Sequence, residues 1–319
     1  MDLLYFSMIL LYWLFLTGVV FLSGVFTSRV LVTGSSGAAT SLLCKDTGKS
    51  FGKIASEIIL IVAILTFLAN VIHFVLHCSV MTETPLNEVF SILSPFATKT
   101  KYGRLTIIRT ILLVAIIATS FIIIKNDNKI STVTGTLFSF ALLIVIAMSG
   151  HQGVKGYMNS HFFLDSLHLV VVSAWIGGLF FIRICVSFLI KGDKIEFWSC
   201  LTSLINRYST LATYCVGLTV GTGIALIYFN VEGYAVFVQT QYGIILLLKM
   251  VLVGIIMVLG GINKFFIIPA LNKTDIGKRT EGTEHEKILL HLVTVEATIG
   301  VVVLFLTSLL THLSPENYL

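Results

Sequence analysis

Eight long apolar runs recur along this chain of 319 residues, and they limit its fold more than any other feature. A helix needs roughly 20 apolar residues to cross the hydrocarbon core of a bilayer. Inside lipid every backbone N–H and C=O group must be satisfied internally, which favours helices for runs of this length. The expected spans are approximately 3–28, 54–80, 105–124, 133–150, 162–190, 207–230, 241–263 and 288–312.

Composition supports the same fold class. The chain is 56% hydrophobic and only 12% charged, about half the charged fraction of a soluble domain. The first span is not a cleaved signal peptide, because it lacks a basic leading region and its apolar run is too long. No connecting segment is long enough to fold separately. We therefore predict an all-α polytopic membrane protein, a single membrane domain over residues 1–319 with eight transmembrane helices and no soluble domain.

Lysine and arginine residues indicate the orientation. With the N-terminus outside, fourteen of the 21 basic residues fall on the inner side, four on the outer side and three within spans. Basic residues concentrate on the cytoplasmic side of membrane proteins, so both termini are expected outside. This asymmetry accounts for the net charge of +5 without a nucleic-acid partner. On the outer side, residues 84–103 are expected to hold a short surface helix that Pro95 breaks.

A polar stripe follows the start of the fifth span. His161, Asp165 and His168 are spaced i, i+4 and i+7, so a helix places them on one face. Polar groups at depth in a membrane are costly and usually mark a binding site or pathway. A simpler explanation is that Asp165 pairs with Arg109, near the outer end of the third span. A histidine at the membrane interface can also be an amphipathic side chain without a ligand role.

Histidines gather near the expected outer side. His73 and His77 share a face of the second span, and His151 follows the fourth. Imidazole with nearby thiol and thioether groups suits copper, and a carboxylate would favour Cu(II) over Cu(I). His77, His161 and His312 also fit the interfacial explanation, and convergence requires their helices to be neighbours. The candidate metal ligands are His73, His77, His151, His161, Asp165 and His168.

Several residues could form a pathway below these ligands. Trp175 continues the stripe and could close the site from beneath, although core packing is the simpler role. Met250 and Met257 could be soft sites for Cu(I), although methionine is more often filler. Lys249 and Glu296 are the deepest charges, at depths expected to differ by roughly 6 Å. They are expected to neutralise each other, and the alternative makes Glu296 a proton or cation relay.

Five segments together resemble the copper resistance D (CopD/PcoD) family of inner-membrane proteins. The resemblance covers residues from about 100 to the C-terminus and is weaker before that. It comprises "SGHQG" (149–153), "LDSLHLVVVSAWIGGLFF" (164–181), "RYSTLATYCVGLTVGTGIAL" (207–226), "YGIILLLKMVLVGIIMVLGGINKFFIIP" (242–269) and "VTVEATIGVVVLFLTSLLTHLSPE" (293–316).

The resemblance implies an eight-span protein of the bacterial cytoplasmic membrane that handles copper, usually proposed as an importer. Members of this family often work with, or are fused to, a CopC-like copper carrier on the outer side. No segment here is expected to form such a domain, so either a separate carrier or no carrier is expected as a partner. The motif residues carried over are His151, Asp165, His168, Trp175, Gly177 and Gly178. The two glycines are expected to permit close helix contact.

Two other functions stay open from the sequence. Paired histidines on facing membrane helices ligate b-type haem, and His73 with His168 lie at suitable depths for a haem oxidoreductase. The second open function is that of a signalling or assembly protein whose bound metal is structural. We find no nucleophile–base constellation, phosphate loop or nucleotide motif, so a hydrolytic enzyme is not expected.

Overall fold

The computed structural model describes residues 3–31, 45–126, 128–150, 160–189, 195–230, 235–273 and 284–313. Within these ranges the regular elements are helices, and eight of them are long and apolar enough to cross a membrane. The prediction of an all-α polytopic membrane protein is therefore confirmed. The elements are α1 (Leu3–Leu31), α3 (Lys45–Thr82), α4 (Val89–Lys99), α5 (Lys101–Lys125), α6 (Lys129–Ser149), α8 (Ser160–Leu189), α9 (Ile195–Asn230), α10 (Ala235–Gln239), α11 (Gln241–Ile262), η1 (Asn263–Ile267), α12 (Ile268–Lys273) and α13 (Glu284–His312).

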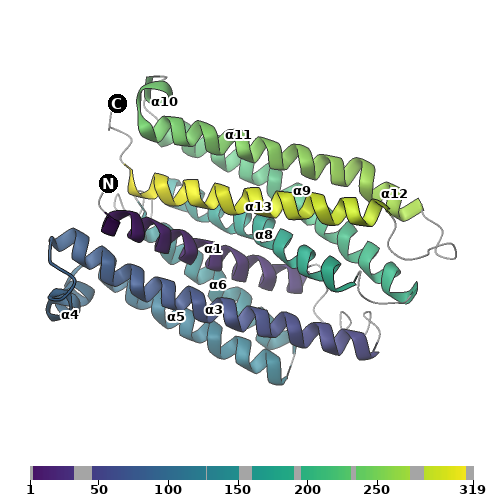
Figure 1. Cartoon of the computed structure of the whole chain (residues 1–319), viewed down its shortest axis with the longest axis horizontal. Coiled ribbons are helices and arrows are strands. Elements are labelled where there is room, and N and C mark those ends of the chain that lie inside the picture. The colour runs from purple at the N-terminus through teal and green to yellow at the C-terminus, as the bar shows by residue number, and fades with distance from the viewer. Residues whose placement is uncertain are drawn as a thin grey trace.

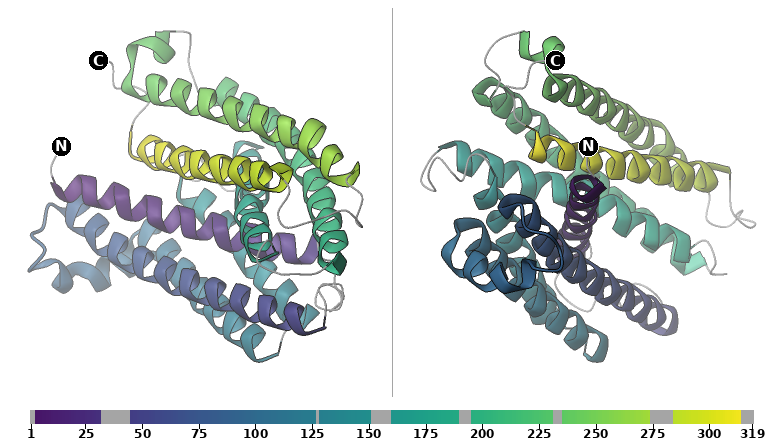
Figure 2. Two further views of the ribbon diagram at one scale, coloured as in Figure 1. Left: turned by 45° about the vertical axis from the view of Figure 1, so that its right-hand side comes forward. Right: turned by 60° about the vertical axis from the view of Figure 1, so that its left-hand side comes forward.

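Helices α1, α8 and α13 form the centre of the bundle (Figures 1 and 2). Helices α3, α5 and α6 pack on one side of this centre, and α9 and α11 lie on the other. Helix α1 begins where α13 ends, and α3 ends and α5 begins at this same end of the bundle (Figure 1). We call it the terminal end. All the histidines predicted to bind metal belong to helix segments near it or to the connection after α6.

Glycines allow α1 and α8 to touch along their backbones. A Cβ on Gly177 would lie 2.1 Å from the Val20 carbonyl oxygen, and one on Gly24 would lie 2.2 Å from the Gly177 Cα. Gly178 likewise leaves room for Tyr208 of α9, because a Cβ on Gly178 would lie 2.4 Å from the Tyr208 ring. Small residues let membrane helices approach closely and gain van der Waals contact. The expected role of Gly177 and Gly178 is confirmed.

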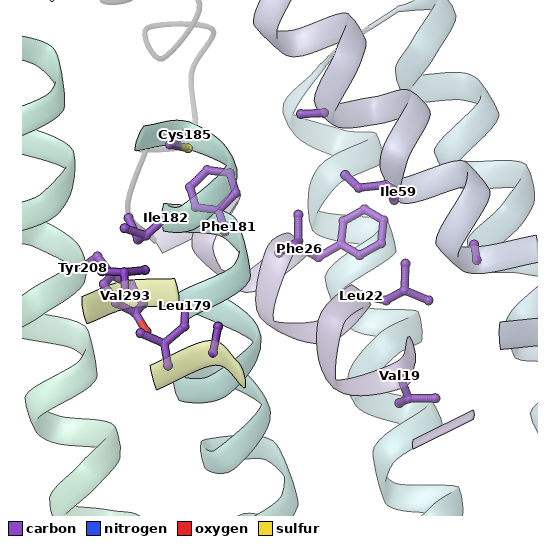
Figure 3. Packing of buried hydrophobic residues seen from close by; sticks show 14 of the residues in the cluster. Val19, Leu22, Phe26, Ile59, Leu179, Phe181, Ile182, Cys185, Tyr208 and Val293 are labelled. Atoms are coloured by element: carbon purple, nitrogen blue, oxygen red, sulfur yellow. The ribbon is translucent and has the colours of Figure 1, made fainter. Parts of the chain in front are cut away.

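Large apolar side chains fill the spaces between the helices (Figure 3). Phe26 and Leu22 of α1 face Ile59 of α3, while Leu179 of α8 lies beside Val293 of α13. All five are fully or almost fully buried. This packing fixes the central helices, so polar residues near their ends are held on a rigid frame.

Pro95 does not break the surface helix, contrary to the prediction. It lies inside α4, where proline removes one backbone hydrogen bond. Tertiary contacts stabilise the helix nevertheless, because the Phe96 ring packs 5.8 Å from Phe74 and 6.4 Å from His77 of α3. The start of α5 also packs tightly against α4, because a Cβ on Gly103 would lie 2.3 Å from the Phe96 carbonyl oxygen.

The seventh span continues further than expected. Its apolar helix runs to Leu271 instead of ending at 263. Between α11 and α12 the helix widens into the π-helical turn η1, where the Ile268 N–H donates to the Asn263 carbonyl five residues earlier. Pro269 follows directly and lacks the N–H of an ordinary α-helical bond, which explains why the hydrogen-bond pattern changes here.

Candidate functional site

Three histidines from two helices meet at the terminal end. The His73 and His77 rings of α3 stack with centroids 5.8 Å apart, as their i, i+4 spacing predicts. The ring of His312, the last residue of α13, lies 6.2 Å from that of His73 at a steep angle. His73 is only 3% exposed, so one imidazole sits at the buried centre of the group.

Two tyrosines complete what we call the histidine–tyrosine cluster, comprising Tyr12, His73, His77, Tyr102 and His312. The Tyr12 ring of α1 lies 5.2 Å from His73 and 5.3 Å from His312. The Tyr102 ring of α5 lies 4.0 Å from that of His77, and its hydroxyl oxygen is 3.3 Å from His73 Nδ1. The cluster thus draws on four helices that are distant in sequence.

Hydrogen bonds leave nitrogen atoms of this cluster available. His312 Nδ1 lies 2.8 Å from the Ser308 carbonyl, which only accepts, so Nδ1 carries the proton and Nε2 keeps a lone pair. If His73 Nδ1 donates to Tyr102 in the same way, its Nε2 is also free to bind. His73 Nε2 and His77 Nδ1 are both buried without a hydrogen-bond partner. Buried polar atoms of this kind call for a ligand or a water molecule.

A buried positive charge borders the cluster. Arg109 of α5 is 1% exposed, and its Cζ lies 5.6 Å from the ring centroids of both Phe15 and Tyr102. The faces of aromatic rings attract a guanidinium group, which explains how the charge is held. Arg109 therefore does not serve as the partner of Asp165 that the sequence suggested. Lys249 on α11 is close enough to Asp165 for the two groups to interact electrostatically.

The polar stripe of α8 faces other helices. The His161 ring packs 4.5 Å from Phe229 of α9. His168 Nδ1 lies 2.8 Å from the Thr222 hydroxyl, which itself donates to the Leu218 carbonyl and so accepts from His168. The stripe therefore forms one face of a helix, as predicted, but His161 and His168 contact α9 and not the histidine–tyrosine cluster.

Asp165, the remaining residue of the stripe, lies near the end of α6. Its Oδ2 is 3.9 Å from the place where a Cβ on Gly150 would stand, at the end of α6. It is also close enough to Tyr12 for the two groups to interact electrostatically. His151 follows Gly150 directly, but it lies outside the described residues. Within the described ranges, no three His, Cys, Asp or Glu side chains already stand at metal-ligand spacing.

Of the proposed pathway residues, Trp175 and Met257 pack in the bundle interior, and Met250 does not. Trp175 is 3% exposed, packs among residues of α1, α9, α11 and α13, and its carbonyl accepts a hydrogen bond of 2.7 Å from Tyr208. Met257 packs against the same residues, whereas Met250 is exposed. Met250 and Met257 therefore do not line one buried path.

Lys249 and Glu296 do not neutralise each other, contrary to the prediction. Asn263 donates a hydrogen bond to Glu296, and Gly260 lies beside the same carboxylate. Lys249 is eleven residues before Gly260 on α11, a separation of about 16 Å along the helix. The predicted difference in depth was too small because it assumed spans just long enough to cross the bilayer, whereas α11 and its continuation reach Leu271.

Comparison with protein families decides the relationship. Residues 2–158 match the model described as copper resistance protein D-like, N-terminal domain, and residues 203–310 match copper resistance protein D. The chain belongs to the copper resistance D family. The first match extends through α1 and α3, where the sequence resemblance was weak, and includes Tyr12, His73 and His77.

Three curated relatives share this family likeness. The chain is 28% identical over 56% of its length to copper transport protein CutJ of Bacillus subtilis and, over the same share, to inner membrane protein YebZ of Escherichia coli. It is 24% identical over 80% of its length to copper resistance protein D of Pseudomonas syringae pv. tomato. The matched regions span 33% of CutJ, 58% of YebZ and 82% of the Pseudomonas protein. No solved structure matches the chain.

Sequence reasoning missed two features of this family member. His312 is absent from the predicted metal ligands, although its position at the expected outer end of the last span is a usable signal. The aromatic residues Tyr12 and Tyr102 were not considered, because tyrosines near a membrane interface are common and carry no spacing that points to a site.

Proposed function

We propose that this protein binds copper at the histidine–tyrosine cluster and moves it across the bacterial cytoplasmic membrane. The observation that carries the proposal is the meeting of His73, His77 and His312 from α3 and α13. Rotation of these rings about their side-chain bonds would turn nitrogens of neighbouring rings toward one ion. Imidazole is a good ligand for copper, and the family and the names of the relatives favour copper over other metals.

The surroundings favour Cu(I) as the bound species. The Arg109 guanidinium beside the cluster disfavours additional positive charge, and the contacts that define the cluster include no carboxylate. Asp165, which suggested Cu(II) in the sequence, lies near Tyr12 and Gly150, and among the described residues it makes no ring contact or hydrogen bond with His73, His77 or His312. A singly charged ion held by neutral imidazoles meets less repulsion than a doubly charged one.

The α8 residues form a second part of the proposal. His161, Asp165 and His168, together with His151, are proposed to hold copper at a neighbouring position at the same end. The Asp165–Tyr12 interaction supports this arrangement, since Tyr12 also contacts His73. Trp175 is proposed to close the path toward the opposite end. Met257, which packs against the same interior residues as Trp175, and Lys249 are proposed as further steps on this path.

The asymmetry of basic residues supports an outward-facing terminal end, and we propose that copper enters there and moves inward. A CopC-like carrier on the outer side is the proposed donor. The test is uptake of copper by liposomes containing the purified protein, with copper supplied on the side of the terminal end. We expect flux well above that of empty liposomes. Copper binding without flux would leave only a storage, signalling or assembly role.

An optical spectrum of the same purified protein distinguishes copper from haem. His73 and His168 contact different partners, Tyr102 and Thr222 respectively, which does not favour a shared haem. We expect stoichiometric copper and no strong Soret band. A Soret band with haem in stoichiometric amount would instead favour the oxidoreductase.

Tyr102→Phe is expected to weaken copper binding by about tenfold. The substitution removes the hydroxyl that orients His73, and loss of such an outer partner typically costs about 10–100-fold in metal affinity. The lower figure applies because the 3.3 Å bond is long. Competition with a chelator of known affinity measures the change. The control is Tyr228→Phe, whose side chain is exposed on α9, and equal affinity of the two variants would contradict the role of Tyr102.

A further inference from the structure

A second polar pair is buried far from the histidine–tyrosine cluster. Glu296 of α13 is 3% exposed and Asn263 at the end of α11 is 6% exposed. Asn263 Nδ2 donates a hydrogen bond to Glu296 Oε1, while Glu296 Oε2 lies 3.6 Å from the place where a Cβ on Gly260 would stand. Sixteen residues separate Glu296 from His312, so the pair lies about 24 Å along α13 from the copper-binding end.

One atom of this pair lacks a partner. Asn263 Oδ1 is buried and makes no hydrogen bond, although its amide group contacts the carboxylate. A buried acceptor without a donor is unfavourable. A protonated carboxyl group would correct this, because an acid and an amide can bond reciprocally. The amide N–H donates to one acid oxygen, and the acid O–H donates to the amide oxygen.

The backbone supports a functional role at this position. Asn263 is the first residue of η1, whose π-helical bond joins the Ile268 N–H to the Asn263 carbonyl. Single π-helical turns within helices are frequent at functional sites. Here the turn begins at Asn263, the residue that contacts α13 through Glu296.

The charged and titratable groups around Glu296 are engaged elsewhere. Tyr208 of α9, which interacts electrostatically with Glu296, donates its hydroxyl to the Trp175 carbonyl. Arg183 of α8 donates from Nε to Thr294, and Lys264 donates to Thr213 of α9. On α1, Arg29 donates to Ser56 of α3.

The donor atoms decide what the pair can hold. Carboxylate and amide oxygens are hard ligands, so this pair is not a good binding site for the soft ion Cu(I). A hard metal ion would require several more oxygens than this pair supplies. A proton needs only the two oxygens present, Glu296 Oε2 and Asn263 Oδ1.

We infer that Glu296 carries a proton that is released as copper crosses the membrane. The inference rests on the proposed function. Without copper, the Oε2–H bond is formed and the hydrogen points to Asn263 Oδ1. When a copper ion passes this buried layer, the Oε2–H bond breaks, the proton leaves to water at the terminal end from which the ion came, and the carboxylate offsets the charge of the ion. After the ion has left toward the opposite end, the carboxylate takes a proton from water at that end and the Oε2–H bond forms again. No group is oxidised or reduced, and transport becomes an exchange of copper for a proton.

Infrared difference spectroscopy of the reconstituted protein tests the proton directly. We expect the C=O stretch of a protonated carboxyl group at neutral pH, lost on addition of Cu(I), absent in Glu296→Gln and retained in Glu57→Gln. Glu57 is an exposed carboxylate of α3, on the half of the helix far from the terminal end, and is the matched control. A spectrum without this band, or the same band in Glu296→Gln, overturns the inference.

A second variant and a flux assay complete the test. Asn263→Leu should shift the carboxyl band to higher frequency, because the acid loses its hydrogen-bond partner, and an unshifted band counts against the pair. In liposomes with a pH-sensitive dye, Glu296→Gln should bind copper normally but lose copper-coupled proton release. Unchanged proton release in this variant also overturns the inference. Absence of copper flux in the wild type, with the carboxyl band present, contradicts the proposed function and not the proton site.

Discussion

His73→Ala is expected to remove high-affinity copper binding at the histidine–tyrosine cluster. His73 is the buried centre of the histidine–tyrosine cluster, in ring contact with Tyr12, His77 and His312. Loss of an outer-shell partner of a metal ligand typically costs about 10–100-fold in affinity, so loss of a ligand itself should exceed that range. Chelator competition with purified protein in detergent measures the affinity.

The control for this substitution is His291→Ala, which changes an exposed histidine near the other end of α13. It should leave copper affinity unchanged. His168→Ala adds a sharper comparison, because His168 bonds to Thr222 and belongs to the second proposed position. A greater loss in His168→Ala than in His73→Ala would place the principal site on α8 and contradict a principal site at the histidine–tyrosine cluster.

Gly177→Val is expected to destabilise the bundle severely. Even the first side-chain atom would lie 2.1 Å from the Val20 carbonyl oxygen and 2.7 Å from the Gly24 Cα. Overpacking of a core usually costs about 1–3 kcal/mol. The upper end applies here, because backbone atoms cannot rotate away as a side chain can. Thermal unfolding of the detergent-solubilised protein, followed by tryptophan fluorescence, measures the loss.

A matched glycine separates packing from helix propensity. Gly221 of α9 has nothing within 4 Å of its hypothetical Cβ, so Gly221→Val makes the same chemical change in open space. We expect its unfolding temperature to stay close to that of the unsubstituted protein. Equal destabilisation of the two variants would show that the α1–α8 contact is not the closely packed centre of the bundle.

The fold class could be predicted because the bilayer imposes it. Each span needs a long apolar run, and the eight runs in the sequence correspond to eight helices in the structure. Local spacing was equally informative, since His73 and His77 stack as i, i+4 residues of one helix should. The glycine pair at 177 and 178 indicated close helix contact for the same local reason.

Contacts between helices could not be predicted in this way. The sequence gives the face of α8 that carries His161 and His168, but not that this face meets α9. It likewise suggested pairs between isolated charges, Arg109 with Asp165 and Lys249 with Glu296. The structure instead holds Arg109 between aromatic rings and joins Glu296 to Asn263. A neutral partner such as Asn263 is harder to predict from sequence, because a charge within a membrane is first expected to pair with an opposite charge.

X-ray absorption spectroscopy of the copper-loaded protein tests most directly whether imidazoles of the histidine–tyrosine cluster bind the ion. The account predicts nitrogen ligands with the outer-shell scattering of imidazole, and a reduced imidazole contribution in His77→Ala. Sulfur ligands, or a spectrum unchanged by that substitution, would contradict it.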